Sequence, residues 1–290
     1  MPRVYMQDAN QFEQIKTALE AAGGFLTDEP HSIDMNETEW IPVLTMFEDT
    51  DDAGLDRLPQ VPFQFGLNLG NTRITKEGVR KLARFSKLAY LYLRSPWVDD
   101  DMMDSVAQLM GQLIILGLGY SKVTDEGVRQ LRKSQTLMSL DLRYTLVTDV
   151  GLERLIELPN LSELLLNVTK VSDRGIGQLA GLSKLATLWL DECKITDRGV
   201  KYLPSFQCLW NLGLTKTLVT DTGLGYLSGC RSLSCLGLDN TGISDAGLRH
   251  LKTLRNLKVI YATGTKVTAA GVAELETALP GCSIAWTQVG

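Results

Sequence analysis

Hydrophobic residues in this chain recur in the spacing L-x-x-L-x-L, which restarts every 24 residues over most of the sequence. In the copy that begins at Leu137, residues 139–143 alternate polar and apolar, which predicts a β-strand with one buried side. Leu152, Leu155 and Leu158 then recur every three residues, which predicts one face of a short helix. The clearest copies begin at Leu113, Leu137, Leu161, Leu185, Leu209, Leu233 and Leu257. A fixed period of about 20–50 residues is typical of a solenoid.

A second recurring phrase follows each predicted strand, as in V-T-D-V-G-L at residues 147–152. Thr148 or Asp149 is expected to cap the free N–H groups of the helix, and Gly151 to let that helix approach its neighbour closely. The acid of this phrase recurs as Asp125, Asp149, Asp173, Asp197, Asp221 and Asp245. Equal spacing predicts a ladder of helix caps along one edge, not carboxylates that converge on a catalytic or metal site.

A small polar residue is expected in the tight turn after each strand, where it bonds the backbone. This position holds Thr72, Ser121, Thr145, Thr169, Cys193, Thr217, Thr241 and Thr265, with Pro96 as the exception. These motifs resemble the leucine-rich-repeat consensus L-x-x-L-x-L-x-x-N-x-L, with Thr in place of Asn or Cys. The chain is similar to bacterial repeats ending T-x-V-T-D-x-G-L, to the cysteine-containing repeats of F-box-type receptors, and to ribonuclease-inhibitor-like proteins.

This resemblance covers about residues 40–286 and implies an α/β, right-handed horseshoe. Its parallel β-sheet would line the concave face, and its short α-helices the convex face. We expect about ten repeats over residues 40–280, and a C-terminal cap strand within 281–290. These repeats would begin at Trp40, Gln64, Leu88, the seven leucines above and, for a final half-repeat, Cys282.

An N-terminal helical cap is expected within residues 1–39, because residues 8–23 carry apolar side chains at helical spacing and end in two glycines. An F-box in the same place is a sharper alternative, since F-box receptors share this repeat type. The segment is short and lacks the Leu-Pro start of that module, so the capping role is preferred.

The third repeat departs from the pattern. Leu88 and Leu113 are 25 residues apart, and Met102 takes the place of the usual glycine. The loop carries Trp97, which is expected to point outward. Two explanations of this departure stay open. Either the loop tolerates sequence drift, or its residues are specific for contact with a partner.

The outward positions of the concave strands are the predicted binding surface. They are richest in aromatic and charged residues in repeats three to seven, which matches the composition of interface hot spots. The residues that we predict to bind a partner are Tyr90, Tyr92, Arg94, Asp141, Arg143, Leu165, Trp189 and Asp191, with Trp97 as a possible loop contact. A merely solvated sheet face is the alternative.

Composition limits which classes of partner and which cellular compartments are expected. The net charge of −5 argues against nucleic acid, which favours a basic stripe. No apolar run reaches the roughly 18 residues that cross a membrane. The first residues lack the apolar segment of a signal peptide. A cytoplasmic monomer is therefore expected, with signal-free secretion left open.

Catalytic chemistry has no visible basis. His31 and His250 are the two histidines, and neither neighbours a nucleophile in a known motif. The five cysteines contain no C-x-x-C pair, which predicts free thiols and no zinc site. We expect no enzyme activity, no metal and no cofactor.

The predicted function is recognition of a protein or peptide. The alternative is a substrate receptor or effector linked to ubiquitin machinery, with its adaptor-binding segment in residues 1–39.

Overall fold

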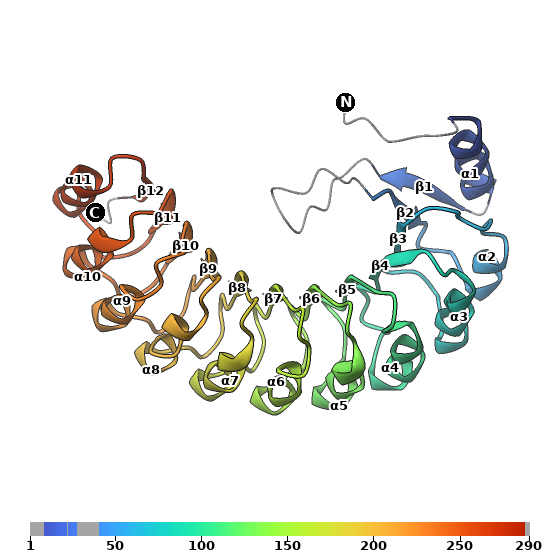
Figure 1. The fold of residues 1–290 in the computed structure, drawn as a ribbon, viewed down its shortest axis with the longest axis horizontal. Helices are drawn as coiled ribbons and strands as arrows, with labels where there is room; N and C mark the ends of the chain where they lie inside the picture. Colours follow the sequence, from blue (N-terminus) through green and yellow to red (C-terminus); the bar gives the residue numbers. More distant parts are fainter. Residues whose placement is uncertain (1–8, 22, 28–40, 288–290) are drawn as a thin grey trace. The chain divides into compact units, whose positions relative to one another are not determined.

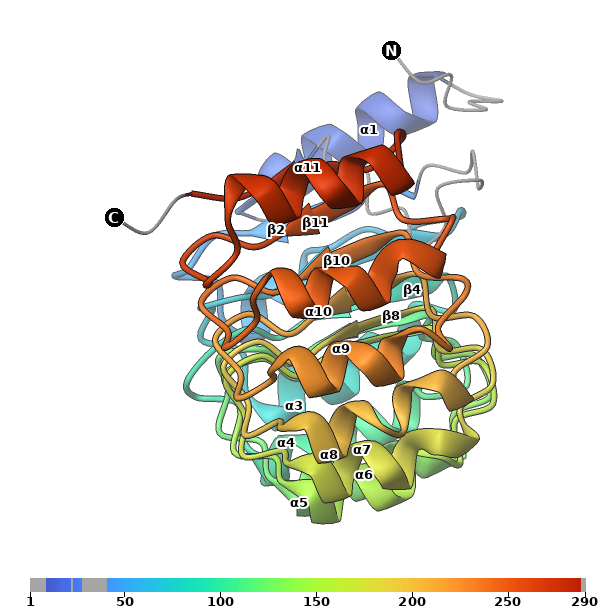
Figure 2. The ribbon, with the colours of Figure 1, turned by 90° about the vertical axis from the view of Figure 1, so that its left-hand side faces the viewer.

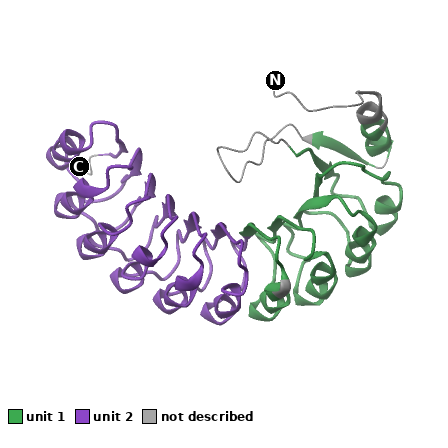
Figure 3. Cartoon of the chain, viewed as in Figure 1, with its two compact units in different colours: residues 1–140 green, residues 141–290 purple. Residues whose placement is uncertain are grey.

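The computed structural model describes residues 9–21, 23–27 and 41–287, in two compact units of residues 1–140 and 141–290 (Figure 3). Within each unit, strands and helices alternate along the chain. The strands form one layer and the helices another (Figure 1). This arrangement confirms the α/β solenoid with a parallel sheet and short helices that the 24-residue period predicts.

The first described element of this unit is α1 (Ala9–Ala21), which confirms the predicted N-terminal helix. Gly23 follows with a φ of 82°, a backbone conformation that favours glycine. The next strand, β1 (Gly24–Thr27), pairs antiparallel with β2 (Val43–Met46) and was not predicted. The remaining strands of this unit pair in parallel in chain order, and they are β3 (Phe65–Asn68), β4 (Leu88–Tyr92) and β5 (Ile115–Gly117). Its other helices are α2 (Asp52–Asp56), α3 (Lys76–Lys81), α4 (Asp100–Val106) and α5 (Asp125–Arg129).

The second unit repeats the pattern more regularly, and Figure 2 shows its helices α8 to α11 stacked in chain order. Its helices are α6 (Asp149–Leu155), α7 (Asp173–Gln178), α8 (Asp197–Val200), α9 (Asp221–Leu227), α10 (Asp245–His250) and α11 (Ala269–Ala278). Its parallel strands are β7 (Glu163–Leu165), β8 (Thr187–Trp189), β9 (Asn211–Gly213), β10 (Cys235–Gly237), β11 (Val259–Tyr261) and β12 (Ser283–Ala285). The remaining strand, β6 (Ser139–Asp141), contains the boundary between the units.

Short 3-10 helices follow several α-helices and lead back toward the next strand. They are Leu82–Arg84, Ala107–Leu109, Gln130–Lys133, Leu179–Gly181, Leu203–Ser205 and Leu251–Thr253. Strands β2 to β11 fall in the ten predicted repeats, and β12 falls in the predicted half-repeat. Trp40, His31 and most of the predicted cap segment lie outside the described residues, so the cap domain and its boundaries stay predictions. Within the described residues, no helix combines the length and the hydropathy needed to cross a bilayer.

The core of each unit lies between its strands and its helices. Leu140 in β6, Leu142 just after that strand, and Leu152 and Leu155 in α6 are at most 1% exposed. Burying one such side chain stabilises the fold by about 1.5–3 kcal/mol. The 24-residue leucine pattern therefore supplies the main driving force for stacking one repeat on the next.

Neighbouring helices are joined by a regular hydrogen-bonded pair. The carboxylate of Asp149, the first residue of α6, accepts from the backbone N–H of Ser172 at 2.7 Å and from its hydroxyl at 2.6 Å. Ser172 is the N-cap of the next helix. The same pair recurs as Asp52–Thr75, Asp100–Thr124, Asp173–Thr196, Asp197–Thr220, Asp221–Ser244 and Asp245–Thr268. The predicted Asp row is thus a structural ladder, and we call these contacts the Asp–Thr ladder.

The N-cap residue completes the contact from its own side. The hydroxyl of Thr148 accepts from the N–H of Val150 at 3.2 Å, so Thr148 is the cap of α6, as one of the two predicted candidates. The turn threonines behave as expected too, since Thr145 donates its hydroxyl to the carbonyl of Leu142 at 2.7 Å. Both polar positions of the motif therefore satisfy backbone groups that the fold would otherwise leave open.

Candidate functional site

In each unit, the side of the strands that faces away from the helices carries the predicted binding residues, and we call it the strand face. In residues 141–290 it brings Arg143, Leu165, Trp189 and Asp191 into one region. Leu165 on β7 lies directly opposite Trp189 on β8 in the parallel register. Leu165 is 8% exposed and Trp189 is half-buried, so the indole is the accessible part of this apolar pair.

Arg143 is fixed beside Trp189 by the carboxylate of Asp141. The guanidinium donates from Nε to Oδ1 at 2.9 Å and from Nη2 to Oδ2 at 2.8 Å. Its Cζ atom lies 6.0 Å from the centre of the Trp189 ring, at the outer limit of a cation–π contact. Asp141 is only 3% exposed, so it orients Arg143 and offers little surface of its own.

Asp191 is held by hydrogen bonds that serve the fold. Its Oδ1 accepts from the backbone N–H of Thr215 at 2.7 Å, and its Oδ2 from the amide of Asn167 at 2.6 Å. Gly213 leaves room for this carboxylate, because a Cβ there would lie 2.8 Å from Oδ1. Burial raises the pKa of the Asp191 carboxyl above its usual range, and the hydrogen bonds from Thr215 oppose that rise.

Two predicted residues of the first unit do not lie on an open surface. Tyr90 and Tyr92 are each 5% exposed and belong to an apolar cluster with Val43, Ala89 and Ile115. The expectation that these tyrosines point into solvent is therefore wrong. The reason is lateral packing over glycines, since a Cβ at Gly117 would lie 2.6 Å from the Tyr92 ring and one at Gly66 would lie 3.1 Å from Tyr90 Cβ. These glycines hold a side chain of the neighbouring strand and do not expose backbone.

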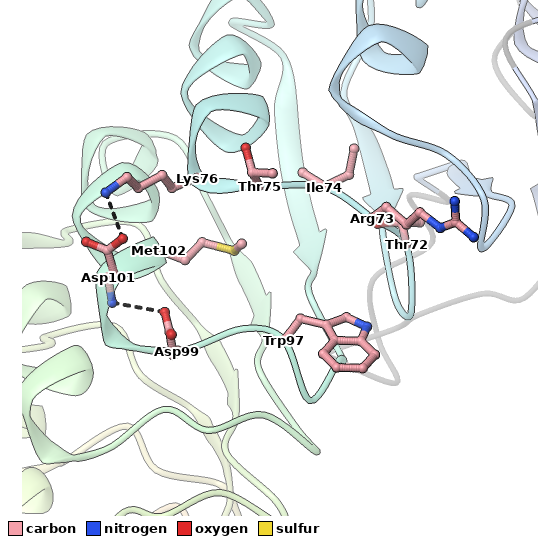
Figure 4. A pocket seen from close by; sticks show the side chains of 9 residues that line it. All are labelled: Thr72, Arg73, Ile74, Thr75, Lys76, Trp97, Asp99, Asp101 and Met102. Carbon is pink, nitrogen blue, oxygen red and sulfur yellow. Dashed lines mark hydrogen bonds and ion pairs between the residues drawn. The ribbon is translucent and has the colours of Figure 1, made fainter.

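Arg94 and Trp97 are the accessible predicted residues of the first unit. The Arg94 guanidinium lies 5.3 Å from the centre of the Tyr92 ring and is half-buried. Trp97 is 69% exposed, which confirms its predicted outward position. Trp97 borders a recess that contains Lys76 and Met102 (Figure 4).

In the part of the chain that the structure describes, no group of three or more His, Cys, Asp or Glu residues could hold a metal ion. All five cysteines are free, and Cys193 and Cys230 are buried. Burial raises the pKa of the Cys230 thiol to about 12, which leaves it protonated and unreactive at neutral pH. The Cys193 thiol donates to the carbonyl of Leu166 in the preceding repeat at 3.0 Å, whereas the turn threonines donate to the carbonyl three residues earlier in their own turn.

Two features escaped the sequence reasoning. Lys76 occupies the place of the ladder aspartate, a difference that aligning α3 with the other repeats would have revealed. The extra residue of the third repeat lies after α4 and not in the Trp97 loop. Leu88 and the N-cap Asp99 are 11 residues apart, as Leu137 and Thr148 are.

Comparison with known proteins agrees with the repeat geometry. The family described as Leucine Rich repeat matches residues 133–155. Among solved structures, an internalin (inlF) from Listeria monocytogenes has a TM-score of 0.54 at 18% sequence identity, and the match covers 98% of this chain and 96% of that chain. The fold is that of the leucine-rich-repeat proteins.

An internalin C2 (inlC2) from the same organism is 22% identical with a TM-score of 0.45, over 73% of this chain and 92% of that chain. No curated protein matches the sequence. Leucine-rich-repeat solenoids are typically non-catalytic protein-binding modules. The narrower T-x-V-T-D-x-G-L type of repeat stays a prediction.

Proposed function

We propose that this chain is a non-catalytic recognition protein that binds a protein or peptide on the strand face of residues 141–290. The observation that carries the proposal is the pairing of an accessible Trp189 with an Arg143 that Asp141 already holds in place. Trp and Arg dominate binding energy at protein interfaces. A side chain fixed before binding loses less conformational entropy on binding than a mobile one.

The surroundings of Trp189 suit a peptide more than a small molecule. Trp189 is the apolar centre and packs beside the buried Leu165 of the neighbouring strand, while Arg143, Asn167 and Asp191 provide polar groups around it. This is the mixture of an apolar centre and a polar rim that protein interfaces show. We further propose that the chain acts as a monomer in the cytoplasm, where its five free thiols would stay reduced.

The proposal is tested by selecting a displayed random peptide library on the immobilised full chain and measuring the affinity of each selected peptide. Trp189→Ala is expected to weaken at least one class of peptide by about tenfold or more. Tyr226→Ala is the matched control, because Tyr226 is an aromatic side chain of the same unit that is 42% exposed on helix α9. If every selected peptide binds Trp189→Ala as tightly as the parent, the strand face is not the binding surface.

A further inference from the structure

One interface between neighbouring helices of the first unit breaks the Asp–Thr ladder at every position. Lys76 stands where the ladder has Asp, and Asp99 stands where it has Thr or Ser. Met102 stands where the other helices have glycine. On either side the ladder is regular, since Asp52 bonds Thr75 and Asp100 bonds Thr124. The three substitutions therefore concern a single contact between α3 and α4.

These three changes fit one another physically. In a regular interface the aspartate carboxylate fills the space that a side chain at the following glycine would need, as Asp100 does beside Gly127. Lys76 has no carboxylate to place there, so Met102 has room for its side chain and is buried at 6% exposure. Lys76 instead pairs through Nζ with Asp101 Oδ2 at 2.7 Å. Asp99 caps its own helix by accepting the N–H of Asp101 at 3.2 Å.

The turn before α4 differs as well, and Pro96 explains the difference. The equivalent turns place a residue in the left-handed region, such as Asn71 at φ 58° and Tyr120 at φ 62°. A proline disfavours helical conformations in the residue before it, so Ser95 does not adopt that conformation. The turn closes through the N–H of Val98 and the carbonyl of Ser95 at 3.1 Å, and Trp97 is displayed at its surface.

The result is a recess of about 490 Å³ beside Trp97, shown in Figure 4. Ile74 and Met102, which are 7% and 6% exposed, form its apolar floor, and the exposed indole of Trp97 stands at its edge. This volume lies in the range of about 300–1,000 Å³ that is typical of ligand sites. Its lining is an apolar centre with polar groups at the rim.

Charge at the rim selects the occupant. Asp99 and Asp101 both line the recess and are exposed, and Lys76 forms an ion pair with Asp101. Arg73 also lines the recess, but its guanidinium points away from Met102 and Asp99 in Figure 4. Asp99 is therefore positioned to attract a cation. Surface carboxylates of this kind contribute more to selectivity than to affinity.

We propose that this recess binds a short segment of a partner protein that carries an aliphatic side chain beside a lysine or arginine. The aliphatic group would cover Met102 and Ile74 against the Trp97 ring, and the basic group would pair with Asp99. This site is separate from the strand face around Trp189, and it lies in the other unit of the chain.

The test uses peptides selected on the full chain from a displayed random library, with affinities measured by fluorescence anisotropy. We expect a class of peptides that pairs a basic with an aliphatic residue and binds Trp97→Ala at least about tenfold more weakly than the parent. The same class should bind Asp99→Asn more weakly and should lose affinity as the salt concentration rises. Trp189→Ala should bind these peptides like the parent, which separates this site from the proposed strand-face function.

A second variant tests the structural origin of the recess. Lys76→Asp, Asp99→Thr and Met102→Gly together restore the ladder pattern of the other repeats, so the chain should keep its thermal midpoint while the peptide class loses its affinity. If no such class is selected, or if its members bind both Trp97→Ala and the restored variant like the parent, the proposal is overturned. If the affinity of every selected peptide depends on Trp189 and not on Trp97, the proposed function of the strand face is supported and the proposed binding at the recess is overturned.

Discussion

A side chain at Gly223 would occupy the space that the carboxylate of Asp197 already fills. The same carboxylate accepts from the backbone N–H of Thr220 at 2.8 Å and from its hydroxyl at 2.6 Å. The aspartate of one repeat thus holds the N-cap residue of the next repeat. It also requires a glycine three residues after that N-cap residue, because its carboxylate fills the space there. The T-D-x-G phrase is therefore a device for joining two repeats. Ala269 stands in the aspartate's place in α11, after which no helix follows in the described residues.

Two glycines of helix α9 are expected to respond oppositely to alanine. Gly223→Ala should lower the free energy of unfolding by about 2 kcal/mol, because the new methyl group displaces the Asp197 carboxylate from Thr220. Gly225→Ala should raise it by about 0.5–1 kcal/mol, because alanine is the better helix former. The nearest atom to a Cβ at Gly225 is His250 Cε1, at an ordinary 3.8 Å. Urea unfolding at pH 7 measures both changes.

The double variant Asp197→Ala with Gly223→Ala is the control for this prediction. Removing the carboxylate removes the closest collision and leaves only the one with Val219 Cγ1 at 2.9 Å, so the added cost of the alanine should be smaller in that background. Equal shifts of Gly223→Ala and Gly225→Ala in the same direction would contradict the role assigned to the ladder.

The turn at Val168 is a second place where a single change is expected to alter stability. Val168 has a φ of 58°, in the left-handed region that β-branched residues rarely adopt. The equivalent residue of a later repeat is Asn240, at φ 55°. Val168→Asn should therefore raise the free energy of unfolding by about 1 kcal/mol. Val168→Ala controls for the loss of side-chain size, and a gain as large as that of asparagine would show that left-handed strain is not the cause.

The Asp191 carboxyl is expected to make stability depend on pH. Burial raises its pKa in the folded state, with Asp239 and Glu192 adding to the rise. Because the ionised form is less favourable in the folded than in the unfolded chain, this group lowers stability as pH rises from about 3.9 through the raised pKa. Asp191→Asn should remove that loss, so the variant should gain stability relative to the parent between pH 3 and pH 7.

The amide in Asp191→Asn can replace both hydrogen bonds of the carboxylate, one of them in the reverse direction. Its oxygen can still accept from the Thr215 N–H. Asn167 now donates through Nδ2, so its amide must turn over for its Oδ1, which has no hydrogen-bond partner, to accept from the new amide nitrogen. Urea titrations at several pH values measure the difference between variant and parent. A constant difference across this range would show that the carboxyl titrates alike in the folded and unfolded chains.

The sequence pattern was sufficient to predict the repeats but not the local exceptions to them. The 24-residue period fixes where Leu140, Leu142 and Leu152 fall, and each is buried as expected. Strand β1 carries no repeat signal and pairs antiparallel with β2, so no periodic argument could have found it. Lys76 was visible in the sequence. Its effect on the contact between α3 and α4 could be inferred only once the structure showed that the ladder aspartate bonds the N-cap of the next helix.

Exposure on the strand face was harder to predict than the face itself. Alternation along a strand shows which side a residue occupies, and Tyr90, Tyr92 and Trp189 all lie on the predicted side. It does not show whether the neighbouring strand offers a glycine against which a side chain can pack. Tyr92 has Gly117 beside it and is buried, and Asp191 has Gly213 beside it. The predicted binding of a partner by these residues is a separate matter and stays a prediction.

The guanidinium of Arg143 makes two hydrogen bonds to the carboxylate of Asp141 and is expected to stabilise this part of the chain. Arg143→Ala should lower the free energy of unfolding by about 2 kcal/mol, because it removes the bidentate partner of a carboxylate that is 4% exposed. Arg143→Lys should cost about half as much, since lysine keeps the charge but not the paired geometry.

Asp141→Asn combined with Arg143→Ala should cost less than Arg143→Ala alone, because no charge is left buried without its guanidinium. If the double variant is the less stable of the two, the ion pair is not what stabilises this part of the strand face. The same double variant also serves the binding experiment. A peptide that loses affinity equally for it and for Arg143→Ala depends on the guanidinium itself, whereas a loss confined to Arg143→Ala reflects disturbance of the strand.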